Sequence, residues 1–206
     1  MIRGALIKWK GEFSMRPGRW STFTATQSYT ISPPGFVWNA IVRLAPFIPI
    51  RVRDAYENGE GSLSATILRF IRLAHERGTA QMAEGELLRY LAECVWLPSA
   101  LLPASGVSWH AIDDDSATAT MSDGMTTISM VAHFGSSGEI MRLSAIRPRA
   151  MNGAFVPTPW TVHVGDYARR DGMMVPTTGR VEWNPPSGPV PYFRATPTDI
   201  HYDFAP

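Results

Sequence analysis

One stretch decides the fold, GELLRYLAECVWLP, which runs from Gly85 to Pro98. Four apolar residues recur at the i, i+3, i+4, i+7 spacing of one helix face: Leu88, Leu91, Ala92 and Val95. The opposite face carries four polar residues: Glu86, Arg89, Tyr90 and Glu93. Pro98 lacks an N–H and clashes with the preceding turn, so we expect the helix Gly85–Trp96 to end just before it.

The chain on either side of this helix is patterned as β-strand. From Phe23 to Ile31, apolar and aromatic residues alternate with Thr and Ser, which is the period of a strand with one polar face. The apolar residues of Ser62–His75 fit both the two-residue period of a strand and the 3.6-residue period of a helix. We predict a short strand that passes into a helix. The remaining predicted strands are Ala5–Phe13, Phe36–Leu44, Ile48–Tyr56, Trp109–Met121, Thr126–Phe134, Glu139–Ala145, Trp160–Tyr167, Gly179–Trp183 and Phe193–Phe204.

These strands predict one curved antiparallel sheet. The connections between them are short and rich in glycine and proline, whereas parallel strands need long crossovers. About nine to eleven strands with one or two helices bury their apolar faces if the sheet curls around the helix. The fold class is therefore mainly β (α+β), a half-barrel or open barrel, and we expect a single domain over residues 1–206.

Charge and composition exclude several classes of protein. The net charge of +1 gives no electrostatic reason to bind nucleic acid or an anionic membrane. No segment offers the ~20 apolar residues of a spanning helix, so no integral membrane segment is expected in this chain. The stretch Met1–Lys10 is too charged for a signal peptide, which predicts a cytoplasmic location, although an anchor in a longer form stays open. The sequence does not indicate the oligomeric state.

No pattern of metal ligands or cofactor-binding residues is present, so neither a metal nor a cofactor is predicted. The five histidines lie singly on separate elements: His75, His110, His133, His163 and His201. The run Asp113–Asp115 lacks the glycine and the distal glutamate of a calcium loop. We interpret it as the solvated end of a strand.

The polar helix face has two interpretations. As an ion-paired surface, Glu86, Arg89 and Glu93 would contribute only a few tenths of a kcal/mol per pair. Charged helix faces are usually solvated, which favours this interpretation. As the lining of a cavity, the same three residues with Tyr90 would form a catalytic or binding constellation. These four are the candidate catalytic residues.

Aromatic residues are the stronger sign of a binding cavity. The chain has seven tryptophans and ten methionines, residue types that line apolar ligand cavities, although an ordinary packed core would use them too. We take Trp38, Trp96 and Trp109 as candidate ligand-binding residues. Arg147, in the motif Arg147-Pro148-Arg149, is positioned to receive an acidic group at the mouth of the cavity, or else it ends a solvated strand.

Several motifs resemble a bacterial family of uncharacterised proteins, a domain of unknown function. They extend from about Trp20 to Tyr202 and are Trp20 with Phe23–Gln27, Pro34–Trp38, Arg53–Tyr56, Gly85–Glu93 and Pro191–Arg194. In the order of its strands and helix, the chain is also similar to the half-barrel carriers of the LolA and LppX lipoprotein type. That second resemblance implies a cavity for lipid or acyl chains between a concave sheet and a helix.

Two functions follow as hypotheses. The first is binding of an apolar or amphipathic small molecule between the curved sheet and the helix. The second is a cofactor-independent enzyme of the cyclase or isomerase type, which would act by confining its substrate in the same cavity. A third class, a protein–protein module that uses an exposed sheet edge, also stays open.

Overall fold

The structure, a computed structural model, describes residues 2–16, 18–45, 48–67 and 71–204. Its α-helix is α1 (Ala80–Glu93), followed by three short 3-10 turns at Cys94–Trp96, Pro98–Leu101 and Pro103–Ser105. The strands before α1 are β1 (Ile2–Arg16), β2 (Arg19–Thr30), β3 (Gly35–Ala45), β4 (Ile48–Glu57), β5 (Glu60–Ile67) and β6 (Ile71–Arg77). Those after it are β7 (Val107–Ala111), β8 (Ser116–Asp123), β9 (Thr126–Phe134), β10 (Ile140–Met151), β11 (Ala154–Gly165), β12 (Ala168–Arg170), β13 (Met173–Val175), β14 (Thr178–Trp183) and β15 (Val190–Phe204).

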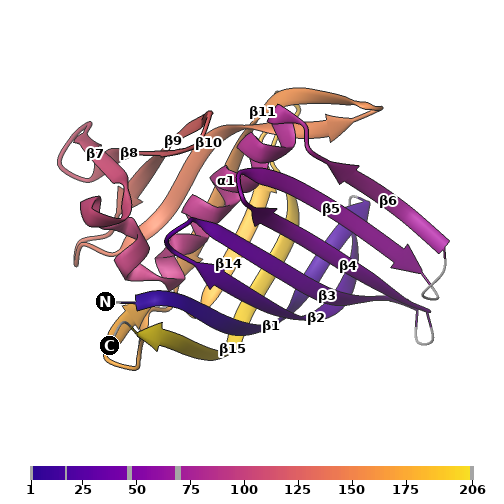
Figure 1. Cartoon of the computed structure of the whole chain (residues 1–206), viewed down its shortest axis with the longest axis horizontal. Coiled ribbons are helices and arrows are strands. Elements are labelled where there is room, and N and C mark those ends of the chain that lie inside the picture. The colour runs from indigo at the N-terminus through magenta and orange to yellow at the C-terminus, as the bar shows by residue number, and fades with distance from the viewer. Residues whose placement is uncertain (1, 17, 46–47, 68–70, 205–206) are drawn as a thin grey trace.

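Thirteen of these strands form one curled antiparallel sheet. Their order is β6-β5-β4-β3-β2-β1-β15-β14-β11-β10-β9-β8-β7, while β12 and β13 form a separate small hairpin. Nearly all neighbours in the sheet are joined by short turns along the chain. The exceptions are β14 beside β11, beyond the small hairpin, and β15, which returns to pair with β1. Figure 1 shows the sheet wrapping around α1, so the fold is a mainly β half-barrel, as the sequence predicts.

The helix α1 lies on the concave side and bridges the two halves of the sheet. It contacts β3, β4 and β5 in one half and β9 and β10 in the other (Figure 1). Its apolar side chains Leu87, Leu88 and Leu91 are fully buried or nearly so. Close packing against β5 requires glycine at position 61, because a Cβ there would lie 2.4 Å from the Met82 carbonyl oxygen.

The alternation of β2 is confirmed by burial. Phe23, Ala25, Gln27 and Tyr29 face the core, and the Thr and Ser residues between them are exposed. One polar residue, Gln27, therefore lies on the apolar face. It is 1% exposed, so its side chain must find a hydrogen-bond partner inside the protein.

Three sequence expectations about the elements are wrong. Ser62–His75 is not a strand that passes into a helix but two paired strands, β5 and β6. Residues 68–70 of this segment lie outside the described residues. Trp109–Met121 is likewise two strands, β7 and β8, because Asp113–Asp115 forms the connection between them. The strand count is thus thirteen in the main sheet and not nine to eleven.

The third error concerns the ends of α1. The helix begins five residues before Gly85, where the Thr79 hydroxyl caps it by accepting a hydrogen bond from the Met82 N–H at 3.1 Å. It ends at Glu93, and a 3-10 turn continues to Trp96. The expected stop before Pro98 is confirmed.

Candidate functional site

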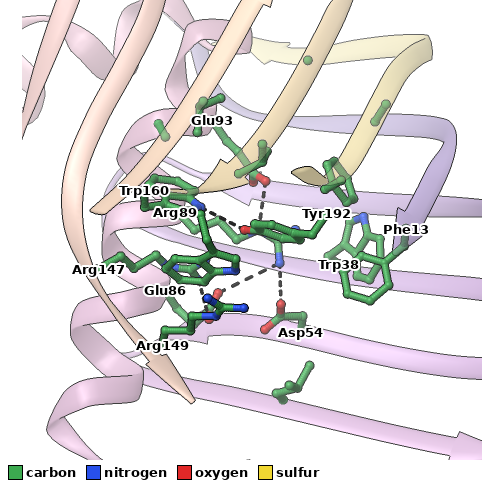
Figure 2. A pocket seen from close by; sticks show the side chains of 18 of the residues that line it. Phe13, Trp38, Asp54, Glu86, Arg89, Glu93, Arg147, Arg149, Trp160 and Tyr192 are labelled. Atoms are coloured by element: carbon green, nitrogen blue, oxygen red, sulfur yellow. Dashed lines mark hydrogen bonds and ion pairs between the residues drawn. The ribbon is translucent and has the colours of Figure 1, made fainter. Parts of the chain in front are cut away.

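A cavity of about 560 Å³ lies between α1 and the concave face of the sheet. Its volume falls within the ~300–1,000 Å³ that is usual for small-molecule sites. Side chains from both halves of the sheet and from α1 line it, so the curvature of the sheet is what creates the space. Figure 2 shows charged side chains and aromatic rings side by side in the lining of this cavity.

Arg89 is the centre of the charged group. Its Nη1 donates to Asp54 Oδ2 on β4 at 2.5 Å, and its Nε donates to Glu93 Oε1, one turn along the helix, at 2.9 Å. The Arg89 side chain is only 13% exposed, so these ion pairs are buried. Its guanidinium also lies over the rings of Phe36 at 4.7 Å and Trp38 at 5.4 Å, which adds a cation–π contribution.

The second oxygen of Glu93 is held by the sheet. Glu93 Oε2 accepts hydrogen bonds from Gln27 Nε2 at 2.7 Å and from the Tyr29 hydroxyl at 3.0 Å. Both donors come from the buried face of β2, which explains the polar residue in that apolar row. Glu93 is thereby fixed on both oxygens, and its part in the site is to orient Arg89.

Arg147 connects the charged group to the other half of the sheet. From β10, its Nη2 donates to Glu86 Oε1 at 3.0 Å and its Nε donates to the Gly85 carbonyl oxygen at 2.9 Å. A second contact of Glu86, from Oε2 to Arg89 Nη1, is longer, at 4.0 Å. The group thus comprises three carboxylates and two guanidinium groups: Asp54, Glu86, Glu93, Arg89 and Arg147.

Burial changes the acidity of two of these carboxyl groups. Desolvation raises the pKa of Glu86 to about 7, with Asp54 acting in the same direction and Arg147 and Arg89 against it. Desolvation also raises the pKa of Asp54, opposed chiefly by Arg89. Glu86 is therefore able to gain or lose a proton near neutral pH, which is the property of a general acid or base.

Aromatic rings form a further part of the cavity lining. Trp183 on β14 stacks on Tyr192 of β15 with ring centroids 5.6 Å apart, and Trp160 on β11 donates from Nε1 to the Tyr192 hydroxyl at 2.9 Å. Arg147 lies over the Trp160 ring at 5.0 Å, so it joins this wall to the charged group. Phe13 also contributes to the lining.

Six of the eight site residues predicted from the sequence line this cavity. They are Glu86, Arg89, Glu93, Trp38, Trp96 and Arg147. The polar helix face is buried, so the surface interpretation favoured by the sequence is wrong; Arg147 likewise does not end a solvated strand. Whether any of the six binds a ligand or takes part in catalysis stays a prediction.

The other two predicted residues lie away from the cavity. Tyr90 is fully buried on a different side of α1, where its hydroxyl donates to the Thr30 carbonyl oxygen at 2.9 Å. Trp109 on β7 donates from Nε1 to the Leu101 carbonyl oxygen and packs against Phe134. The prediction that Tyr90 lines the cavity is wrong because its spacing from Glu86, Arg89 and Glu93 places it at the border of the polar face of the helix.

Trp96 is held in the cavity wall by its surroundings. Its indole Nε1 donates to the Pro176 carbonyl oxygen at 2.7 Å, and its ring meets Trp9 edge-on at 4.9 Å. The ring fits because residue 179 is glycine: a Cβ there would lie 3.0 Å from it. Trp96 therefore forms a fixed end of the cavity.

Sequence reasoning missed Asp54 and Gln27 as members of the site. Asp54 is in register with Trp38, which in turn is in register with Gln27, so the three form one row across β4, β3 and β2. A signal was present, since each polar residue interrupts an otherwise apolar alternation. The distant aromatic residues Trp160, Trp183 and Tyr192 had no such signal, because their position depends on the curl of the sheet.

Other features of the described residues bear on classes of function. No group of three or more His, Cys, Asp or Glu side chains in this part of the chain is arranged to hold a metal ion. No helix within 2–16, 18–45, 48–67 and 71–204 is long and apolar enough to cross a membrane. The cytoplasmic location and the 1–206 domain limits stay predictions from the sequence.

Comparisons with known proteins support the fold. Residues 1–202 match the sequence model of DUF6920, a family of unknown function. No curated protein matches the chain. The crystal structure of a LolA superfamily protein from Nitrosomonas europaea is similar over 98% of this chain and 87% of that chain, with a TM-score of 0.54 and 9% identity. At this identity, the similarity concerns the fold alone.

Proposed function

This chain belongs to the DUF6920 family, and we propose that it binds an apolar or amphipathic small molecule in the cavity between α1 and the curved sheet. The observation that carries the proposal is the cavity itself, which persists beneath a helix that is buried on both faces. A filled core would have closed this space, because protein interiors otherwise pack to the density of organic crystals.

The lining supports an amphipathic ligand in particular. Aromatic rings from β11, β14 and β15 offer an apolar surface in the lining. The charged group around Arg89, next to these rings, offers hydrogen-bonding atoms. Ligand sites are commonly built this way, with mostly apolar walls and a few fixed polar groups that orient the molecule.

Tryptophan emission tests the proposal directly. Five tryptophans line the cavity: Trp9, Trp38, Trp96, Trp160 and Trp183. We expect the uncharged probes N-phenyl-1-naphthylamine and dodecanol to change this emission with a saturable, one-to-one stoichiometry. Native mass spectrometry of freshly purified protein, followed by solvent extraction, then identifies any molecule that it retains.

A matched pair of variants shows whether binding occurs in the cavity. Val181 on β14 lines the cavity and Val131 on β9 does not, while both side chains are half-buried. Val181→Phe fills part of the space and is expected to weaken dodecanol binding at least tenfold. Val131→Phe should leave it within twofold. Equal effects of the two variants, or no saturable binding by the wild type, would contradict the proposal.

The acidity of Glu86 favours a second candidate, a cofactor-independent cyclase or isomerase. A carboxyl group with a pKa of about 7, placed in a largely apolar cavity, is suited to move a proton on a confined substrate. In this candidate Glu86 transfers the proton, and Arg89 or Arg147 stabilises negative charge on the substrate.

The catalytic role of Glu86 is tested by comparing the molecules that the wild type and a Glu86 variant retain through purification. The Glu86→Gln variant keeps the shape of the side chain and removes its proton chemistry. If Glu86 is catalytic, wild type and variant purified from the same host should retain isomers of equal mass but different chromatographic retention. Retention of one identical molecule by both proteins would exclude a catalytic role for Glu86.

A further inference from the structure

The charged group leaves two carboxylate oxygens without a hydrogen bond. Among the described residues, Asp54 Oδ1 and Glu86 Oε2 are buried and have no hydrogen-bond partner, although both side chains line the cavity. A buried acceptor without a donor costs about 1–3 kcal/mol, and more when it is charged. Because both acceptors line the cavity, a ligand that donates hydrogen bonds to them would remove this cost.

The two arginines of the charged group already donate to oxygens of the protein. Arg89 donates to Asp54 and Glu93, and Arg147 donates to Glu86 and to the Gly85 carbonyl oxygen. A carboxylate or phosphate would have to break these pairs to bind the guanidinium group of Arg89 or Arg147. It would also meet the two free carboxylate oxygens, and like charges repel at this range. The wall therefore disfavours an anionic head group.

We infer that the ligand is a cationic amphiphile, a long-chain primary amine whose ammonium group donates hydrogen bonds to Asp54 Oδ1 and Glu86 Oε2. An ammonium group has three N–H donors and no acceptor, which matches the two free acceptors of Asp54 and Glu86. Its chain would lie along the aromatic rings of Trp160, Trp183 and Tyr192. This inference rests on the proposed function and names its ligand class.

The sequence alone points the other way, since Arg147 near an apolar cavity suggests an acidic ligand. The pairing of Arg147 with Glu86 removes that expectation. In the absence of an amine, a proton on Glu86 would reduce the negative charge buried at these oxygens. The raised pKa of both carboxyl groups agrees with this, so amine binding is expected to displace that proton.

Three probes with the same chain and different head groups test the inference. Dodecylamine, dodecanol and dodecanoate are titrated at pH 8 below their micellar concentrations, and tryptophan emission reports binding. We expect dodecylamine to bind at least tenfold more tightly than dodecanol, and dodecanoate to bind least tightly. In Glu86→Gln the advantage of the amine should fall at least tenfold, while dodecanol binding changes less than twofold. Glu60→Gln, at an exposed ion pair, is the matched control and should change nothing.

The outcomes separate this inference from the proposed function. If no probe saturates, both are wrong. If all three bind within threefold of one another, or dodecanoate binds most tightly, ligand binding stands and the inference is wrong. An amine advantage that persists in Glu86→Gln also overturns it. If circular dichroism shows that Glu86→Gln does not fold, the same titrations with Asp54→Asn and the pH series described next test the inference instead.

The pH series uses the wild-type protein. The amine stays protonated up to about pH 10, like a lysine side chain, whereas Glu86 loses its proton near pH 7. Dodecylamine affinity should therefore rise between pH 5.5 and 8.5, with dodecanol affinity unchanged. A flat amine profile contradicts the inference. The charged and titratable groups that act on Glu86 are Arg89, Glu93, Asp54, Arg147 and Tyr192, with Glu76 and Arg149 elsewhere in the lining.

Discussion

The two faces of α1 are both buried, yet the protein stabilises them by different means. Leu87 and Leu91 on one face are fully removed from water and are surrounded by other apolar side chains. Arg89 and Glu93 on the other face are nearly as buried but lie within a set of ion pairs and hydrogen bonds. An amphipathic pattern therefore identifies a helix and its two faces, without showing whether the polar face meets water.

The difference has an energetic consequence. Apolar burial is non-directional and contributes roughly in proportion to area. The charged face depends on each partner being present, since a buried ion left alone keeps its desolvation cost. We therefore expect single substitutions on the two faces to differ in size, in pH dependence and in their effect on ligands.

The largest effect is expected from Arg89→Ala. The substitution leaves the carboxylates of Asp54 and Glu93 buried without their counter-ion, so the free energy of unfolding should fall by about 3–5 kcal/mol. Urea unfolding followed by circular dichroism measures it. The control is Arg77→Ala, at an exposed pair with Glu60, where the loss should stay below about 0.5 kcal/mol. Equal losses in the two variants would show that the charged face of α1 is solvated after all.

Leu91→Ala tests the apolar face in the same assay. Because Leu91 is fully buried, the expected loss is about 2–5 kcal/mol, from lost transfer energy and the space left behind. This loss should not change between pH 5 and pH 8. Leu102→Ala, at a side chain that is 45% exposed, serves as the control and should cost less than about 0.5 kcal/mol. A strong pH dependence for Leu91→Ala would mean that the two faces are not independent.

The third prediction concerns the pH dependence of the charged face. Folding raises the pKa of Glu86 from 4.5 to about 7, so the folded protein binds this proton more tightly than the unfolded chain does. The resulting stability is complete below pH 4.5 and is lost as the pH rises through 7. It amounts to roughly 1–3 kcal/mol. In Glu86→Gln the free energy of unfolding should fall less between pH 5 and pH 8 than it does in the wild type, by that amount. An unchanged fall would assign the titration to another group, such as Asp54.

The smallest effect is expected from Tyr90→Phe, at the border between the two faces. It removes one hydrogen bond, from the hydroxyl to the Thr30 carbonyl oxygen, and should cost about 1 kcal/mol. Dodecylamine affinity should be unchanged, because Tyr90 does not line the cavity. Loss of binding in a stably folded variant would restore Tyr90 to the site, where the sequence had placed it.

Local patterns were enough to predict much of the fold. The alternation in β2, the spacing along α1 and the turn residues between strands each depend on neighbours in the sequence, and each is confirmed. The errors arose where two patterns fit the same residues. The apolar residues of Ser62–His75 fit both the strand period and the helix period. The segment forms strands because β5 and β6 pair with each other, which the local sequence does not specify.

The candidate site was only half predictable for the same reason. Glu86, Arg89 and Glu93 share one helix, so their spacing brings them together. Asp54 and Arg147 join them from β4 and β10, which lie on opposite sides of the half-barrel. No local pattern specifies that meeting, because it depends on how far the sheet curls. The same holds for Trp109, which lies on β7 at the far edge of the sheet, away from the cavity.

The position of β1 has a consequence for synthesis of the protein. β1 lies between β2 and β15, so the first strand of this sheet to be synthesised must wait for the last strand of the sheet before its second edge is paired. During translation, β1 and β14 would both present open edges, which are sites for mispairing with other chains. The two ends of the chain are neighbours in the finished sheet (Figure 1). A circular permutant that joins Phe204 to Ile2 through a linker and opens the chain at Gly106, just before the edge strand β7, would make β15 and β1 consecutive without separating any other paired strands. It should aggregate less during refolding.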